Sequence, residues 1–428
     1  MRWTIAQVVD ALGTRPGTGL NPLARVAGVS IDSRAIRAGE LFMALHGPRH
    51  DGHDHVASAL ERGAMAAVVA EAQLPRYAGP VRERSIAVAD TFDALKQLAR
   101  AVRESWSGKV AGITGSVGKT TTKEILAALL GAKLRVLKSE GNLNNEYGLP
   151  LTLFRLEETD QAAVLEMGMS RRGELRRLAA IARPDVGVVT RVSPAHLEFF
   201  SSVDEIALAK RELIEGLNGR ESTAVVNADD PRVAAFGAFA PGRVLTYGIE
   251  KPAFFMAQEI EDRGALGSAF DYVSPEGHVR LELSVPGRHA IANALAALAA
   301  ASVWDIGAAE AQNVFLSLRA PAMRGELLRF SNGAALINDS YNSSPAALEA
   351  MTELLAATPN FRRRILAAGE MRELGTASPD LHREAGRELN GSFILGALCP
   401  PSLGPIRSSY GETSLKPPPA AEEGRRSR

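Results

Sequence analysis

The residues best suited to bind phosphate lie in a glycine-rich segment between a strand pattern and a helix pattern. Residues 109–114 form a short apolar run that predicts a buried strand, and residues 120–132 carry apolar side chains at helical spacing. Gly115 and Gly118 lie between them, where glycine permits a tight turn that points successive backbone N–H groups at one small space. That space lies at the N-terminus of the following helix, where the helix dipole favours an anion.

Lys119 and Thr120 follow the second glycine and complete a phosphate-binding pattern. The lysine supplies a cation for the outer phosphates of a nucleotide, and the threonine hydroxyl can ligate Mg²⁺. Ile113 occupies the place of the first glycine in the strict nucleotide-binding motif, so the match is incomplete. The alternative is a glycine-rich turn with an incidental lysine. Because a strand precedes the loop and a helix follows it, we favour the phosphate site.

Length and composition indicate a globular protein with about three domains, because 428 residues exceed what one core accommodates. The chain carries 49 basic and 49 acidic residues, and this balance argues against electrostatic binding of nucleic acid or an anionic membrane. We find no apolar run of membrane-spanning length and no signal-peptide pattern. The single cysteine, Cys399, cannot form an internal disulfide. We therefore expect a cytoplasmic protein.

Residues 1–107 predict a small α/β unit with short strands and two short helices. Asp32, Ser33 and Arg34 follow the first strand pattern. They could form a phosphate or ribose site at the end of that strand. A capped turn with a surface arginine is the other interpretation, and the residues alone favour it.

Residues 108–318 alternate between strand and helix patterns, which predicts a mainly parallel sheet covered by helices on both faces. Ligands gather at the carboxyl ends of the strands in such sheets. Glu166 and His196 each follow a strand and should lie near the phosphate loop. Mg²⁺ prefers oxygen ligands, so Glu166 is the better candidate. Taken separately, the glutamate could cap a helix and the histidine could be a loop residue, but their shared position favours a functional site.

Lys210 lies in a helix pattern that spans residues 206–217. Such a lysine commonly faces solvent. If it instead points into a site near metal ions, burial lowers its pKa and makes the neutral amine accessible.

The alternation of strand and helix patterns restarts near residue 319 and predicts a third, Rossmann-like unit, in which Asp339 follows a strand. The pattern stops near residue 390. Residues 391–428 are rich in proline and lack strand or helix periodicity, so we expect a disordered tail. The third unit would then be incomplete and would leave a sheet edge exposed.

Taken in order, these segments resemble the Mur ligases of peptidoglycan synthesis. The similarity extends from about residue 5 to 390, and no single motif carries it alone. It rests on the order and spacing of the phosphate loop and of further segments at residues 142–148, 165–168, 193–198, 227–231, 287–295, 339–345 and 369–375.

The resemblance implies an α/β fold of three domains. A small α/β domain at 1–107 would bind the UDP-sugar, and a central domain at 108–318, a phosphate-loop parallel sheet with helices on both faces, would bind ATP. A Rossmann-like ligase domain would follow at 319–390, ahead of the tail at 391–428. The implied reaction is ATP-dependent and uses Mg²⁺. It joins D-alanyl-D-alanine to UDP-N-acetylmuramoyl-tripeptide (UDP-MurNAc-tripeptide) through an acyl phosphate, in a cytoplasmic monomer.

The same resemblance implies roles for individual residues. Lys119, Lys210 and His196 would be catalytic, and Lys210 would be carbamylated to become a metal ligand. The metal would be held by Thr120, Glu166, His196 and Lys210. ATP would contact Gly115, Ser116, Val117, Gly118, Lys119, Thr120, Thr121, His289, Asn293, Arg324 and Asp339. The UDP-substrate would contact Ser33, Arg34, Asp51 and Asn142.

Other functions remain open at this stage. A sibling Mur ligase that adds a different amino acid, or a folylpolyglutamate synthetase, is the nearest enzyme alternative, and residues 339–345 argue against both. The alternative from another class is a protein that binds nucleotide or UDP-sugar without catalysis because its third domain is altered. ATP binding without product formation would distinguish this protein from the enzyme.

Overall fold

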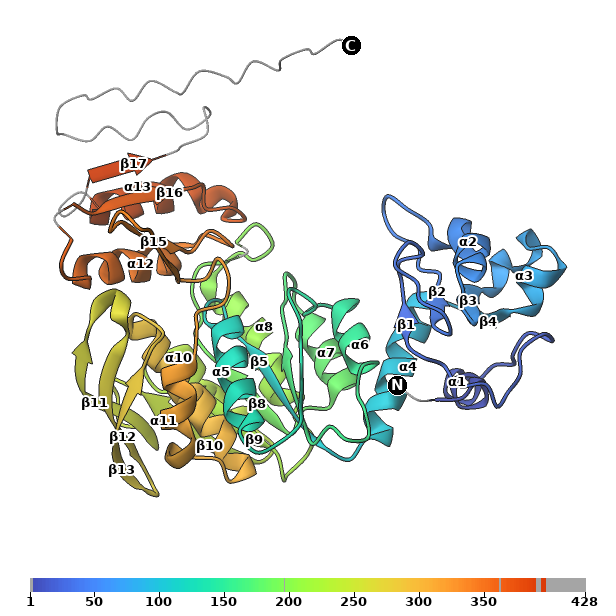
Figure 1. Cartoon of the computed structure of the whole chain (residues 1–428), viewed down its shortest axis with the longest axis horizontal. Helices are drawn as coiled ribbons and strands as arrows, with labels where there is room; N and C mark the ends of the chain where they lie inside the picture. Colours follow the sequence, from blue (N-terminus) through green and yellow to red (C-terminus); the bar gives the residue numbers. More distant parts are fainter. Residues whose placement is uncertain (1–2, 196, 362, 390–393, 398–428) are drawn as a thin grey trace, which may run out of the picture.

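The computed structural model describes residues 3–195, 197–361, 363–389 and 394–397 (Figure 1). Strands form a four-stranded sheet, a nine-stranded sheet and two separate pairs. In Figure 1 the N-terminal part lies at one end of the molecule, the large sheet occupies the centre, and the C-terminal strands lie above that sheet. The α/β architecture with a central, parallel-dominated sheet agrees with the sequence-based prediction.

The N-terminal part is a parallel sheet with strands in sequential order and short helices around it. Its strands are β1 (Val29–Ser30), β2 (Leu41–Met43), β3 (Ala66–Ala70) and β4 (Ser85–Val88). Its helices are α1 (Ile5–Leu12), α2 (Val56–Glu61), α3 (Gly79–Glu83) and α4 (Thr91–Ser105). Helix α1 begins where Thr4 and Gln7 form a reciprocal capping box, and it ends at Gly13 in a left-handed conformation.

The central sheet has the strand order β13-β12-β11-β10-β9-β8-β5-β7-β6. Its parallel strands are β5 (Lys109–Thr114), β6 (Val136–Lys138), β7 (Ala162–Glu166), β8 (Val186–Val189), β9 (Thr223–Asn227) and β10 (Arg243–Gly248). Strands β7, β8 and β9 are buried along their whole length, as expected for a sheet covered on both faces. An antiparallel extension follows and consists of β11 (Phe255–Asp262), β12 (Ser268–Ser274) and β13 (Gly277–Leu283).

Two hydrophobic clusters cover the two faces of the central sheet. One contains side chains of α5 (Lys119–Gly131), α10 (Arg288–Ala301) and α11 (Ala308–Ser317). The other contains side chains of α4, α6 (Gly148–Leu153), α7 (Glu174–Ala182) and α8 (Val203–Glu215), with the short α9 (Pro231–Ala234) nearby. Helix α10 is almost entirely buried and rich in alanine, which lets α5 pack closely against it.

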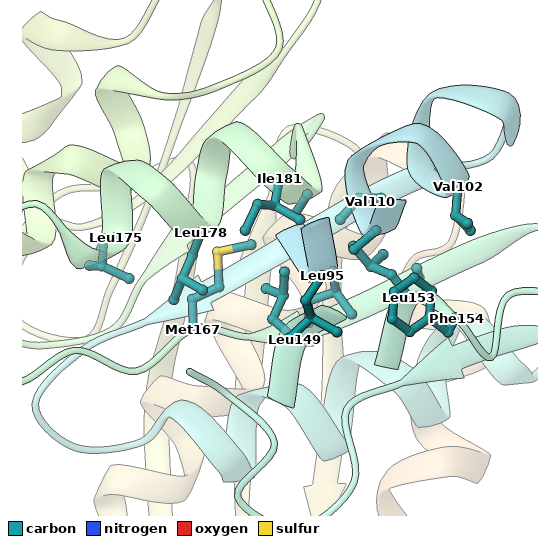
Figure 2. Close-up of a cluster of buried hydrophobic side chains, with 14 of the residues drawn as sticks. Leu95, Val102, Val110, Leu149, Leu153, Phe154, Met167, Leu175, Leu178 and Ile181 are labelled. Carbon is teal, nitrogen blue, oxygen red and sulfur yellow. The ribbon is translucent and has the colours of Figure 1, made fainter. Parts of the chain in front are cut away.

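Helix α4 joins the N-terminal part to the central part through a shared core (Figure 2). Leu95 and Val102 of this helix pack among buried side chains of the central part. Those side chains are Val110, Leu149, Leu153, Phe154, Met167, Leu175, Leu178 and Ile181. The same cluster continues into α1 and the N-terminal sheet, so hydrophobic packing links these two parts without a break.

Arg103, near the end of α4, adds a polar connection at this junction. Its side chain is 6% exposed and donates hydrogen bonds to the carbonyl oxygens of Ala182 (2.8 Å), Arg183 (3.2 Å) and Trp106 (3.1 Å). It also forms an ion pair with Asp185 at 2.9 Å. The guanidinium is therefore paired on several sides, which offsets the cost of burying its charge.

The C-terminal part consists of two strand pairs and two helices. Strands β14 (Glu326–Arg329) and β15 (Ala335–Asn338) form an antiparallel hairpin, and β16 (Ile365–Ala368) pairs in parallel with β17 (Ile394–Ala397). The helices are α12 (Pro345–Ala357) and α13 (Ser378–Leu389).

Strand β17 corrects one sequence-based expectation, because it lies in the segment 391–428 for which we predicted no strand. The run Ile-Leu-Gly-Ala at 394–397 precedes the first proline of the tail, Pro400, so its backbone N–H groups are free to pair with β16. The predicted disorder from residue 398 onward lies outside the described residues. Across the described ranges no helix is long and apolar enough to cross a membrane.

We predict that Arg103→Met destabilises the protein by about 3 kcal/mol, because Asp185 loses its ion pair and three carbonyl groups lose a donor in a buried junction. Calorimetric thermal unfolding measures the effect as a melting temperature several degrees lower. Arg100→Met is the matched control, since Arg100 lies exposed on the same helix and its partner among the described residues is Glu104. We expect it to change stability by less than about 0.5 kcal/mol. Equal melting temperatures for the two variants would contradict the assignment.

Candidate functional site

A cavity of 880 Å³ lies at the carboxyl ends of the central strands and extends to the C-terminal part. The central part contributes the phosphate loop, Glu166, Lys210 and Asn293, while the C-terminal part contributes Arg324 and Asp339. This is where the parallel topology places ligand-binding residues. Most of the residues predicted for ATP and metal therefore surround one space.

The phosphate loop connects β5 to α5, as the sequence predicted. Gly118 precedes the helix with φ +86°, a conformation that favours glycine, and a methyl group there would lie 2.4 Å from Oδ1 of Asn293. The segment after β8 holds the loop in place: the Ser116 N–H donates to the Arg191 carbonyl (2.7 Å), and the Ser116 hydroxyl donates to the Ser193 carbonyl (3.0 Å). The loop is thus fixed by the neighbouring strand rather than by its own sequence alone.

Lys119 is the first residue of α5 and folds back over the loop. Its ammonium donates to the carbonyl oxygens of Gly115 (2.9 Å) and Ser116 (3.3 Å). Burial lowers the pKa of Lys119, and the nearby Glu166 carboxylate opposes this shift. A cation at this position can contact the phosphates of a bound nucleotide.

Glu166 ends β7 and is 2% exposed. One carboxylate oxygen accepts a hydrogen bond from the Thr120 hydroxyl at 2.7 Å, and the other accepts one from the Asn144 side-chain amide at 2.9 Å. The structure therefore brings together Thr120 and Glu166, both predicted as metal ligands. Sequence reasoning gave Asn144 no role, although it lies in the polar segment 142–148 that we had noted. Its position beside Glu166 follows from a chain reversal that periodicity does not reveal.

Lys210 points from α8 into the same cavity and is 2% exposed. Burial and the neighbouring Lys119 cation lower its pKa well below the usual range of lysine. Within the described residues its amine has no hydrogen-bond or ion-pair partner. This environment favours the neutral amine, which is the nucleophilic form.

The side chains beside the phosphate loop include oxygen donors that could bind Mg²⁺. Thr120 and Glu166 provide a hydroxyl and a carboxylate, the hard oxygen ligands that Mg²⁺ prefers while it keeps several waters. Among the residues that the structure describes, no group of three or more His, Cys, Asp or Glu side chains is arranged to hold a metal ion, at this site or at another. His196, the third predicted side chain, lies outside the described residues. The oxygen donors that are present fit Mg²⁺.

His289 and Asn293 lie on α10 and line the cavity next to the loop. The Thr122 hydroxyl donates to Oδ1 of Asn293 at 3.3 Å, which ties α10 to α5. Burial lowers the pKa of His289 to about 4, so its imidazole is neutral at pH 7. Both residues are therefore placed to contact a nucleotide bound at the loop.

Arg324 and Asp339 approach the cavity from the C-terminal part. The Arg324 guanidinium lies 4.0 Å from the centre of the Tyr341 ring, a cation–π contact that sequence reasoning missed. Burial raises the pKa of Asp339 to about 6, against the opposing effects of the Gly325 N–H and of Arg324. The two parts also touch directly, since the Glu198 N–H donates to the Glu373 carbonyl at 3.1 Å.

The four residues predicted to contact the UDP-substrate lie elsewhere. Arg34 forms an exposed ion pair with Asp32 at 2.9 Å, and Ser33 lies beside it. Asp51 accepts from Nδ1 of the buried His53 at 2.6 Å, and Asn142 is exposed in the loop before α6. None of the four lines the 880 Å³ cavity.

Comparison with known proteins identifies the family. Three family profiles match in chain order: "Mur ligase family, catalytic domain" at 25–103, "Mur ligase middle domain" at 113–301 and "Mur ligase, glutamate ligase domain" at 323–399. A UDP-N-acetylmuramoyl-tripeptide–D-alanyl-D-alanine ligase of Bacillus subtilis is 36% identical over 84% of this chain and 77% of that protein. The chain belongs to the Mur ligase family. It is an ATP-dependent ligase by this membership.

Other members of the family support the same assignment. The ligase of the same name from Escherichia coli is 34% identical over 91% of this chain and 84% of that protein. Among solved structures, MurF from Acinetobacter baumannii is 28% identical with a TM-score of 0.85, covering 93% of this chain and 86% of that one. MurF from Thermotoga maritima, in complex with ADP, is 31% identical with a TM-score of 0.78, covering 86% and 83%.

We predict that Gly118→Ala weakens ATP binding about tenfold or more, because an alanine there is strained and its methyl group meets Asn293. Isothermal titration calorimetry with a non-hydrolysable ATP analogue measures the effect. Gly131→Ala is the matched control: Gly131 ends the same helix, and an added methyl group meets nothing within 4 Å. That variant should bind as the wild type does. Equal affinities for the two variants would exclude the loop as the phosphate site.

Proposed function

We propose that the chain catalyses amide-bond formation between D-alanyl-D-alanine and the peptide of UDP-MurNAc-tripeptide, at the expense of ATP. The observation that carries this proposal is the convergence of Lys119, Lys210 and the Thr120–Glu166 pair on one cavity, faced by Arg324 and Asp339. The names of relatives at 34% and 36% identity support the choice of substrates.

The chemistry requires an activated carboxyl group. An amine does not displace oxide from a carboxylate at useful rates, because oxide is a very poor leaving group. Transfer of the γ-phosphoryl group of ATP to the terminal carboxylate of the tripeptide gives an acyl phosphate and ADP. The amine of D-alanyl-D-alanine then attacks the carbonyl carbon, phosphate leaves, and the amide nitrogen loses a proton. Positioning and charge stabilisation supply most of the rate in phosphoryl transfer.

We assign the phosphate contacts to the loop and its helix. The backbone N–H groups of residues 117–121 and the Lys119 ammonium would bind the outer phosphates of ATP. Thr120 and Glu166 would hold Mg²⁺, together with His196. Bound Mg²⁺ neutralises charge on the phosphates. His289 and Asn293 would lie beside the nucleotide, while Arg324 and Asp339 would reach it from the third domain.

Lys210 has a separate role in the proposal. Its buried amine, which has no partner in the described ranges, would add to carbon dioxide and lose a proton, which gives a carbamate. This reaction replaces the neutral amine with an anion that can share in holding a metal. The depressed pKa of Lys210 supports it, because only the neutral amine reacts.

The proposed domains are 1–107 for the UDP-sugar, 108–318 for ATP and a third domain from residue 319 onward for the incoming amine. Ser33, Arg34, Asp51 and Asn142 would contact the UDP-substrate. Contact between the third and central domains, such as that between Glu198 and Glu373, would exclude water that could otherwise hydrolyse the acyl phosphate. We further propose that the enzyme is monomeric and acts in the cytoplasm.

The direct test is phosphate release by the purified chain with ATP, Mg²⁺, UDP-MurNAc-tripeptide and D-alanyl-D-alanine, with each substrate omitted in turn. Release that requires both the tripeptide and the amine supports the ligase. ATP binding with no release in the complete mixture would favour the non-catalytic nucleotide-binding protein.

We predict that Lys119→Ala abolishes this release while the fold is retained, because the phosphates lose their nearest cation. Circular dichroism and melting temperature check the fold. Lys133→Ala is the control: Lys133 follows the same helix and is 51% exposed in its side chain, and its ion-pair partner in the described part of the chain is Glu310. It should keep the wild-type rate. Retained ligase activity in Lys119→Ala would refute the assignment.

The pKa of Asp339 predicts a pH dependence. Its value of about 6 in the folded protein exceeds the ordinary 3.8. Between these two pH values Asp339 is therefore protonated in the folded state and ionised in the unfolded state. The contribution of Asp339 to stability therefore falls as pH rises through this window. The carboxylate that would contact ATP is lost as pH falls below about 6.

We accordingly expect the KM for ATP to rise about tenfold between pH 7 and pH 5, as the ionised fraction of Asp339 decreases. Initial rates at saturating UDP-substrate and amine provide the measurement. Asp339→Asn should raise the KM at pH 7 and remove the dependence near pH 6. His289 does not account for this change, because its pKa of about 4 lies below the window. An unaltered profile in Asp339→Asn would assign the titration to another group.

A further inference from the structure

Lys123 and Glu124 follow the phosphate loop on α5, and the proposed reaction gives them no role. Lys123 lies on α5 one turn after Lys119 and is only 1% exposed. Its ammonium donates to the Ser139 carbonyl at 2.9 Å and pairs with the Glu124 carboxylate at 2.9 Å. A buried ammonium is costly unless it is paired and hydrogen-bonded. The two contacts of Lys123 therefore offset the cost of burying its charge, and one of them connects it to Ser139.

Ser139 follows β6 and is 1% exposed. Its N–H donates to the Val164 carbonyl at 3.0 Å, and its hydroxyl accepts from the N–H of Glu166 at 3.1 Å. Ser139 is thus bonded to Lys123 through its carbonyl and to Glu166 through its side chain. A shift of Ser139 would move the backbone of Glu166 or leave its N–H without an acceptor.

Helix α5 reaches Glu166 by two routes. Thr120 and Lys123 are three residues apart, so they lie on one face of the helix. Thr120 donates to the Glu166 carboxylate, and Lys123 bonds the residue that accepts from the Glu166 backbone. The carboxylate and its main chain are consequently both positioned by the helix that begins at the phosphate loop.

We propose that Lys123 is a positioning residue for the Mg²⁺ site: through Ser139 it fixes Glu166 relative to Thr120. This inference rests on the proposed function, in which Thr120 and Glu166 hold the metal. Lys123 itself does not line the cavity, so it acts only through these neighbours. Residues that orient metal ligands in this way commonly change metal affinity by about 10–100-fold when they are replaced.

The test measures metal binding separately from turnover. Mn²⁺ serves as the probe, and electron paramagnetic resonance of free Mn²⁺ gives its dissociation constant in the presence of a non-hydrolysable ATP analogue. We expect Lys123→Met to weaken Mn²⁺ binding about tenfold. Lys138→Met is the matched control, because Lys138 pairs with the other oxygen of Glu124 at 2.5 Å but is 44% exposed in its side chain. It should bind Mn²⁺ within about twofold of the wild type.

Ser139→Ala and the double variant Lys123→Met/Ser139→Ala test the route. If Lys123 acts through Ser139, the single effects are similar and the double variant is much less than additive. Fully additive effects would overturn the route. Melting temperature and circular dichroism check folding, and if Lys123→Met does not fold, Ser139→Ala carries the same expectation of weakened Mn²⁺ binding.

Kinetics provide an independent readout. Lys123→Met should require a higher Mg²⁺ concentration for half-maximal phosphate release, with the KM for UDP-MurNAc-tripeptide unchanged. Wild-type affinity for Mn²⁺ in a folded Lys123→Met variant would refute the inference. If the wild-type chain itself binds no Mn²⁺ with the nucleotide analogue, the proposed metal site fails instead, so the two failures are distinguishable.

Discussion

The buried Glu166 carboxylate is the constraint on which the site depends. A carboxylate at 2% exposure needs partners on both oxygens, and here one comes from the phosphate-loop helix and the other from the loop before α6. The hydrogen bonds from Thr120 and Asn144 therefore fix two segments against the end of β7. Thr120 follows Lys119 in the first turn of α5. The hydrogen bond from Thr120 to Glu166 therefore also sets the distance between the Lys119 ammonium and the Glu166 carboxylate. Electrostatic catalysis requires this kind of fixed arrangement before the substrates bind.

The sheet makes that arrangement possible. Strands β5, β7 and β8 are adjacent and parallel, so the loop, Glu166 and the segment that holds Ser116 leave the sheet at one edge. Helices on the two faces bury separate hydrophobic clusters, which keeps the strand order fixed. The surrounding packing can then offset the cost of burying polar groups of the site, such as the Lys210 amine, which has no partner among the residues that the structure describes.

Sequence patterns predicted the parts of the site that depend on local rules. The phosphate loop is a contiguous motif, and the pairing of Glu166 with Thr120 follows from the rule that carboxyl ends of parallel strands meet. The contact between Asn144 and Glu166 was missed because it depends on how a turn-rich segment reverses. The strand before Asp339, β15, was predicted, but its partner β14 and strand β17 were missed. Short strands depend on their partners more than on their own residues. The pKa shifts of Asp339 and Lys210 arise from burial, which likewise depends on contacts between distant segments.

The distribution of hydrophobic cores indicates which part of the enzyme moves during closure. The N-terminal and central parts share one cluster through α4, with Arg103 bonded across the junction, so their relative position is costly to change. The C-terminal part has a small cluster of its own around Met371, Leu374 and Ala385. It meets the central part at the cavity and through contacts such as that between Glu198 and Glu373. We infer that the C-terminal part is free to move relative to a fixed N-terminal and central unit, and that this motion would carry Arg324 and Asp339 towards or away from the cavity.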